Sequence, residues 1–451
     1  MKLRVSALFL ALAAFAPAAP SMPPNVIFIL ADDLGYGDLG AFGQKLIQTP
    51  RLDRMAAEGM KFVQSYAGAT VCAPSRCSLM TGMHNGHAAI RGNREIKPEG
   101  QQPMPADTFT VAHLFQRAGY ATGCTGKWGL GHPGSTSTPD RMGFDFFFGY
   151  NCQLRAHEYY PDHLWRNDER VELDGKTYSH DLIADETLGF IRAHRDQPFF
   201  LYAAFTLPHA KLQVPDLGPY ADEPWPDNFK TVAAMITRLD RDVGRILDLL
   251  KELGIDERTL VFFCSDNGAA HRDELFRHSG DLRGYKRDMY EGGLRSPSLV
   301  RWPGKIPAGT VSEQVWTFYD FLPTIGELVG QQPPNAVDGV SVLPALLDPS
   351  AKVEHPPLYF EFHERGFDQA SRRGNWKAVR HGTKGAIELY DLAADPSETR
   401  DVAAKHPDEV AWFTEFFRTA RTDSAVWPID ETPRPRRARP AKAAAAQGET
   451  S

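Results

Sequence analysis

The chain has 451 residues, of which 42% are hydrophobic and 24% are charged, and its formal net charge is −7 at pH 7. This length allows two or three domain-sized units with a sizeable core, and the composition is typical of a soluble globular protein. An acidic chain has no overall attraction for nucleic acid, so we expect no nucleic-acid partner. An anionic ligand would have to be bound by a local cluster of cations.

The chain begins with the pattern of a secretory signal peptide, which we predict over residues 1–18. Lys2 and Arg4 precede an apolar stretch, and Ala16-Pro17-Ala18 has the form of a cleavage site. The apolar stretch is shorter than the ~20 residues that span a bilayer. We therefore predict an exported protein, periplasmic or secreted, with no membrane span.

The cysteines are sparse for an exported protein. There are five in the whole chain, an odd number that is too small for a disulfide scaffold of this length. We predict that most of them are buried free thiols.

Short apolar runs alternate with amphipathic patterns from residue 24 to residue 330. The runs predict strands at 25–30, 119–124, 198–205 and 259–264, and the amphipathic patterns predict helices at 110–119, 181–195 and 229–254. This alternation is typical of an α/β domain with a mostly parallel sheet sandwiched by helices.

The pattern changes after residue 331. Short strands are predicted at 358–363, 375–381 and 387–392, followed by a helix at 406–421. We interpret residues 331–425 as a small C-terminal α+β domain with an antiparallel sheet. Residues 430–451 are rich in Pro, Arg and Ala, and they predict a disordered basic tail.

Polar side chains directly follow two of the predicted parallel strands. Asp32 and Asp33 follow the first strand, and Asp266 and Asn267 follow the last one. The carboxyl ends of parallel strands meet at one edge of a sheet, where ligands bind. Either pair alone is more simply read as ordinary loop residues, but together they form an all-oxygen set that favours calcium or magnesium over zinc.

The stretch "CAPSR" (72–76) opens a predicted helix that runs to Thr81 and ends at Gly82. Cys72 then lies at the helix N-terminus, where the dipole favours negative charge, and Arg76 can face the same side. From these residues alone, a thiolate nucleophile is a real alternative. A zinc site lacks a second ligand pair, and a disulfide between Cys72 and Cys77 would close a very tight loop.

The same stretch matches the sulfatase signature C-x-P-S-R. Further blocks follow in the order typical of that family: "NVIFILADDLGYGDLG", "TGKWGLG", "LPHA", "CSDNG", "KRDMYEGG" and "ELYDLAADPSE". From about residue 24 to 420, the chain resembles a formylglycine-dependent, arylsulfatase-like member of the alkaline phosphatase superfamily.

The resemblance implies an alkaline-phosphatase-like domain over 24–330 and hydrolysis of a sulfate ester, on a sulfated sugar or an aryl sulfate. It implies a bound calcium ion and conversion of Cys72 to Cα-formylglycine by a separate maturation enzyme. The implied metal ligands are Asp32, Asp33, Cys72, Asp266 and Asn267. The implied catalytic residues are Cys72, Arg76, Lys127, His209 and Lys286. One hydroxyl of the aldehyde hydrate would attack sulfur, and His209 or Lys286 would protonate the leaving alcohol.

One position departs from the family pattern. The usual block is G-K-W-H-L-G, whereas this chain has Gly129 in place of the histidine. We hypothesise that His132, or a water molecule, takes over its role.

The sequence indicates less about the substrate than about the reaction. Residues 149–165 combine Arg155 and His157 with several aromatic residues, which suits a sugar-binding loop. Packing of the aromatic residues under the loop is an equal alternative. The same two interpretations, site or surface, apply to His84, His87, Arg91, His271, Arg272 and His278.

Two other functions remain open at this point. One is a phosphonate or phosphate ester hydrolase of the same superfamily. The other is a sulfate-ester binding protein that has lost catalysis, for which Gly129 is the only support.

Overall fold

The computed structural model describes residues 22–430 and residue 432. The predicted signal peptide (1–18) and nearly all of the predicted basic tail (430–451) lie outside the described residues. Within the described part, every helix is too short or too polar to cross a membrane.

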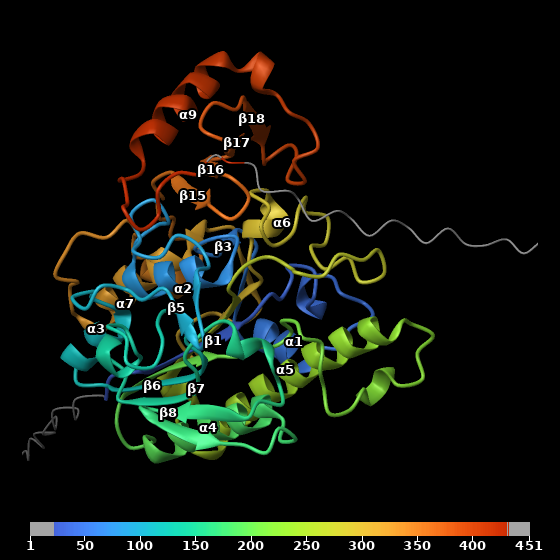
Figure 1. Ribbon diagram of the computed structural model, residues 1–451, viewed down its shortest axis with the longest axis vertical. Helices are drawn as coiled ribbons and strands as arrows, with labels where there is room; N and C mark the ends of the chain where they lie inside the picture. The colour runs from blue at the N-terminus through green and yellow to red at the C-terminus, as the bar shows by residue number, and fades with distance from the viewer. Residues whose placement is uncertain (1–21, 431, 433–451) are drawn as a thin grey trace, which may run out of the picture.

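A ten-stranded sheet forms the centre of the larger part of the molecule (Figure 1). Its five central strands are parallel, and antiparallel strands flank them on both sides. In sheet order the strands are β13 (Thr310–Ser312), β2 (Met60–Phe62), β12 (Ser298–Arg301), β11 (Thr259–Ser265), β1 (Asn25–Ala31), β10 (Phe199–Ala204), β6 (Ala121–Lys127), β7 (Phe146–Tyr150), β8 (His163–Arg166) and β9 (Glu169–Glu172).

Helices cover both faces of this sheet, as predicted. Alternate residues of β1 point to opposite faces: Phe28 belongs to the core with α2, α3 and α7, whereas Ile27 belongs to the core with α1, α4 and α5. The helices are α1 (Pro50–Glu58), α2 (Cys72–Thr81), α3 (Val111–Arg117), α4 (Ser179–Ala193), α5 (Asp227–Glu252), α6 (Glu291–Leu294), α7 (Phe321–Val329) and α8 (Leu343–Leu347). The continuous apolar sequence of β1 is explained by this two-sided burial.

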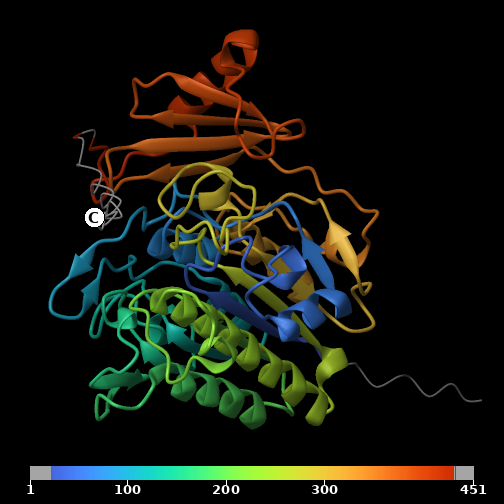
Figure 2. The ribbon, with the colours of Figure 1, turned by 90° about the vertical axis from the view of Figure 1, so that its right-hand side faces the viewer.

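A four-stranded antiparallel sheet with one long helix forms the C-terminal part. Its elements are β15 (Leu358–Phe362), β16 (Asp368–Arg373), β17 (Trp376–His381), β18 (Ile387–Asp391) and α9 (Pro407–Thr419). Both views show this part, in orange and red, at the end of the molecule opposite α4 and α5 (Figures 1 and 2). The predicted antiparallel sheet is confirmed, but the boundary between residues 330 and 331 stays a prediction.

Strand β16 differs from the prediction, because its sequence "DQASRR" has no apolar run. It forms a strand because β15 and β17 pair with it on both sides. Two short strand pairs complete the structure: β3 (Ser65–Tyr66) with β14 (Trp316–Thr317), and β4 (Glu95–Ile96) with β5 (Gly100–Gln101).

All five cysteines of the chain lie in the described part, and all are buried and free. The prediction of buried free thiols is therefore confirmed.

Candidate active site

The two acidic pairs of the sequence meet at the carboxyl edge of the central sheet. β1 and β11 are neighbours in register, with Ala31 opposite Ser265, so the residues that follow each strand start at the same level. The backbone of Asp33 has a φ of 67°, which breaks the strand alternation and lets both carboxylates serve one point. The Asp33 amide donates to Asp266 Oδ1 at 3.2 Å.

Helix α2 brings Cys72 to this edge. The helix begins at Cys72 and ends at Gly82 in the left-handed conformation, as the sequence predicts. Cys72 Sγ lies 3.5 Å from Asp32 Oδ1 and 3.3 Å from Lys286 Nζ. Its side chain is 2% exposed, so the sulfur faces a nearly closed, charged site.

Arg76 fastens α2 to the strand ends. Its Nε and Nη2 atoms donate to Asp266 Oδ2 at 3.1 and 2.8 Å, and its Nη1 atom donates to the Lys127 carbonyl at 2.7 Å. Lys127, the last residue of β6, places Nζ 2.6 Å from Asp32 Oδ2. Both cations are fully buried.

Lys286 and His209 close the site from two loops. Lys286 Nζ lies 2.6 Å from Asp33 Oδ1, and His209 Nε2 lies 3.3 Å from Asp33 Oδ2. Asn267 Nδ2 also donates to Asp33 Oδ1, at 2.7 Å. The predicted metal ligands and the predicted catalytic residues therefore all converge, although they come from segments more than 200 positions apart.

The neighbouring charges shift the pKa values of the three carboxyl groups in different directions. Burial raises the pKa of Asp32, but the attraction of Lys127 and of the other cations outweighs it and leaves that pKa well below its usual range. Asp33 behaves in the same way, with a pKa of about 2. Burial and the charge of Asp32 raise the pKa of Asp266 to about 7.

The thiolate alternative for Cys72 is disfavoured by its surroundings. Burial raises the pKa of the thiol to about 12, although Lys127 and Lys286 lower it. At neutral pH the thiol keeps its proton, and a protonated thiol is a poor nucleophile.

The donor set fits a hard divalent cation. Asn267 Oδ1 is buried and has no hydrogen-bond partner, and such an orphaned acceptor is costly unless something binds it. Single ligand atoms of Asp32, Asp33, Cys72 and His209 lie within 4.8 Å of one another. Carboxylate and amide oxygens grouped in this way are typical calcium ligands.

Comparison with known proteins identifies the family to which this chain belongs. The sulfatase family model matches residues 24–331, and the model for the C-terminal region of N-sulphoglucosamine sulphohydrolase matches residues 283–412. The N-acetylgalactosamine-6-sulfatase of Canis lupus familiaris is 35% identical over 381 residues, which are 78% of this chain and 71% of the relative. This chain belongs to the sulfatase family.

Solved structures agree with this assignment. The crystal structure of Ps i-CgsB in complex with k-i-k-neocarrahexaose is 27% identical, with a TM-score of 0.79, and the match covers 91% of this sulfatase and 95% of that chain. The phosphonate monoester hydrolase of Agrobacterium radiobacter shares the fold alone, with 20% identity, a TM-score of 0.63 and coverage of 91% and 100%. The α/β prediction is confirmed, and so is the sulfatase resemblance.

Of the predicted substrate residues, His157 lies beside His209, one of the predicted catalytic residues. Its ring stacks on the ring of His209, with centroids 4.2 Å apart and an interplanar angle of 9°. Burial and the nearby charge of His209 lower the pKa of His157 to about 3, so its ring is neutral at pH 7. Arg155, two residues earlier, is 38% exposed and lies 3.4 Å from Asp162. For Tyr159 the packing alternative holds, because its hydroxyl donates to the Thr206 and His209 carbonyls beneath the loop.

The hydrogen bonds of His132 in the described part of the chain do not link it to the predicted catalytic residues. Its ring Nδ1 lies 3.1 Å from the Pro133 carbonyl and its amide donates to Ser135 Oγ, so its hydrogen bonds stay within its own turn. Gly129 has a φ of 72°, and a Cβ atom there would come within 2.5 Å of Gln153 Nε2. The buried Gln153 amide thus occupies the space beside Gly129. No pattern in the sequence predicts this contact.

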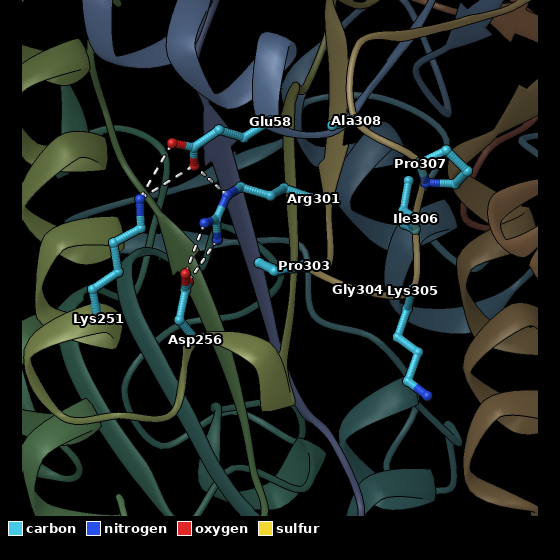
Figure 3. A pocket seen from close by; sticks show the side chains of 10 residues that line it. All are labelled: Glu58, Lys251, Asp256, Arg301, Pro303, Gly304, Lys305, Ile306, Pro307 and Ala308. Atoms are coloured by element: carbon cyan, nitrogen blue, oxygen red, sulfur yellow. Dashed lines mark hydrogen bonds and ion pairs between the residues drawn. The ribbon is translucent and has the colours of Figure 1, made fainter.

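At the opposite edge of the sheet lies a hollow whose charged side chains pair with one another. Figure 3 shows its ion pairs: Arg301 binds Asp256 at 2.6 Å and Glu58 at 2.7 Å, and Lys251 lies 3.2 Å from Glu58. These groups satisfy one another and lie near the amino end of β11. The hollow therefore does not compete with the site at Cys72.

Proposed function

We propose that this sulfatase removes sulfate from a sulfated carbohydrate, using Cys72 converted to Cα-formylglycine. We further propose a bound calcium ion held by Asp32, Asp33, Asp266, Asn267 and the modified residue 72. The observation that carries the proposal is the position of Cys72, at the start of α2 between Lys286 and Asp32. When present, the modified side chain supplies the nucleophilic oxygen, and the cation supplies positive charge for the sulfate oxygens.

The remaining groups of the chain have separate tasks in this proposal. Lys127 and Lys286 offer ammonium groups to the sulfate oxygens as charge grows on them. Arg76 is already engaged by Asp266 and the Lys127 carbonyl, so we assign it the positioning of α2 and β6. Because burial excludes most water, these charges act in a medium of low polarity where they are strong.

His209 and Lys286 are the candidates to protonate the leaving alcohol. Both approach Asp33, at 3.3 and 2.6 Å. His157, stacked on His209, would limit how the departing sugar lies in the site.

The relatives support the carbohydrate as substrate class. N-acetylgalactosamine-6-sulfatases match at 35% identity, and Ps i-CgsB was crystallised in complex with k-i-k-neocarrahexaose. We propose export of the chain and maturation of residue 72 by a separate enzyme, in keeping with the signal pattern of residues 1–18.

Steady-state rates on a matched pair of 4-nitrophenyl sulfate and 4-nitrophenyl phosphate test the reaction class. We expect kcat/KM for the sulfate to exceed that for the phosphate. The opposite order would favour the phosphonate or phosphate hydrolase, and turnover of neither ester by matured protein would favour the binding protein.

A further inference from the structure

The hairpin between β15 and β16 reaches the active site from the C-terminal sheet. Glu364 of this hairpin accepts a hydrogen bond from the Asn93 amide at 3.4 Å. Asn93 Oδ1 in turn accepts from the Ala73 amide at 3.1 Å, in the first turn of α2. The hairpin is thereby tied to the residue next to Cys72.

Arg287 approaches the same place from the loop that carries Lys286. Its backbone amide donates to Thr70 O at 3.1 Å and to Thr70 Oγ1 at 2.9 Å, two residues before Cys72. Its Nε atom donates to Glu364 Oε2 at 3.0 Å. Burial works against the charge of Arg287, but Glu364 outweighs it and raises the pKa of the guanidinium. The backbone of Arg287, between Lys286 and its partner Thr70, places the residue beside the predicted catalytic groups.

Three arginines gather here around two carboxylates, a set that we call the arginine rim. Arg287 is paired with Glu364, and Arg272 lies 3.3 Å from Asp288. Within the described part of the chain, the ion pair of Arg365 is a long one of 4.0 Å to the same Asp288. The ion pairs of the rim thus join three arginines to two carboxylates, and Arg365 has the longest of these pairs.

Folding does not account for Arg365. Burial and the nearby charges of Arg287 and Arg272 lower its pKa, which means that its surroundings work against its charge. Its side chain is 35% exposed, and its carboxylate partner also pairs with Arg272. A crowded cation with so weak a partner, beside an active site, is an arrangement that an anionic ligand would stabilise.

We propose that Arg365, with Arg272 and Arg287 around it, forms a subsite for a second anionic group of the substrate. The group is a carboxylate or a further sulfate on the saccharide whose ester is cleaved at residue 72. The substrate is then polyanionic and not singly charged. This inference rests on the proposed sulfatase reaction on a saccharide and specifies its substrate class.

Calorimetric titration of protein bearing Cys72→Ala tests the subsite, because binding is then measured without turnover. The ligands are a chondroitin 6-sulfate tetrasaccharide, its carboxyl-reduced form and an iota-carrageenan tetrasaccharide. A second substitution, Arg365→Ala, should weaken binding of a polyanionic tetrasaccharide about fivefold to tenfold. Arg365→Lys should lose less, and Arg418→Ala, which removes an arginine of α9 paired with Glu415, should lose nothing.

The carboxyl-reduced ligand identifies the second anion. If the second anion is the carboxylate, carboxyl reduction of the ligand weakens its binding to the Cys72→Ala protein. It then does not weaken binding to the protein that also carries Arg365→Ala. If the second anion is a sulfate, the loss at Arg365 appears with iota-carrageenan and persists after carboxyl reduction. The subsite would be overturned if adding Arg365→Ala left the affinity for the tetrasaccharides unchanged. It would also be overturned if neither polyanion bound to the Cys72→Ala protein.

Thermal unfolding of each variant verifies the fold, and Arg365→Gln replaces an Arg365→Ala variant that does not fold. Hydrolysis of 4-nitrophenyl sulfate tests the proposed function separately, because that ester carries no second anion.

Discussion

Two groups of side chains in the described part of the chain have the geometry of a metal site, yet they differ in their surroundings. The strand-edge cluster consists of Asp32, Asp33, Cys72 and His209. The His84 cluster consists of His84, His87 and Asp338, near the end of α2. Both bring ligand atoms within 4.8 Å of one another, so distance alone does not separate them.

The His84 cluster is closed on itself. His84 Nδ1 accepts from the Gly86 amide at 3.0 Å, so its neutral ring carries the proton on Nε2, and a protonated nitrogen binds no metal. Asp338 accepts from the His84 amide and from His87 Nδ1, both at 2.9 Å. The Asp338 amide donates to the Gly82 carbonyl at 2.9 Å, so the cluster serves to fasten the end of α2.

The strand-edge cluster has the opposite character. Its carboxylates are held by the side chains of Lys127, Lys286 and Arg76 rather than by turn amides, and Asn267 Oδ1 beside it has no partner. Buried charges of this density are expensive to assemble. The comparison teaches that residues of metal-ligand type do not by themselves identify a functional site. Buried charges and an unpartnered acceptor, which contribute nothing evident to folding, identify it better.

Removing Cys72 should have the largest effect. Cys72→Ala should lower kcat/KM for 4-nitrophenyl sulfate by roughly 10³-fold or more, because the nucleophile is lost. His87→Ala, the matched change in the other cluster, should stay within about threefold of the unaltered protein. Comparable losses in the two variants would erase the distinction between the clusters.

Metal removal should have the next largest effect. Dialysis against a chelator should lower the activity roughly 100-fold, and added calcium should restore it. Asp33→Asn should abolish the restoration, whereas His84→Ala should leave it intact. If the chelated protein keeps full activity, no calcium ion takes part, and if magnesium restores it better, the ion is magnesium.

The smallest effect concerns stability at acid pH. Burial lowers the pKa of His84 to about 4, below its ordinary value of 6.5, so between these values the unfolded chain binds more protons than the folded one. The free energy of unfolding should therefore fall as the pH falls from 6.5 to 4. In the His84→Gln protein this fall should be smaller by about 2 kcal/mol. Urea unfolding at several pH values measures the difference, and parallel curves for the two proteins would contradict it.

Much of the site could be predicted because its residues follow strand ends. Once β1 and β11 are recognised as parallel neighbours, Asp32 and Asp266 must share an edge, and the helix signals of "CAPSR" place Cys72 at the start of α2. These inferences need only local patterns and one topological rule.

The remainder depends on packing between distant segments. The strand character of β16 comes from its neighbours, and the contact of Gln153 with Gly129 comes from two separate loops. The β15–β16 hairpin, which carries Arg365, is linked to the start of α2 through Glu364, which is far from α2 along the chain, and Asn93, which lies on another loop. No periodicity in the sequence predicts these contacts. The hypothesis that His132 takes over the role of the histidine missing at Gly129 rests only on its closeness along the chain.

Mass spectrometry of the tryptic peptide spanning residues 62–76 tests the central claim most directly, with protein produced alongside a formylglycine-generating enzyme and shown to hydrolyse 4-nitrophenyl sulfate. The account predicts that residue 72 has exchanged its sulfur for oxygen and lost two hydrogens, and that an aldehyde-specific hydrazide labels the peptide. A fully active sample in which Cys72 is still an intact thiol would contradict it.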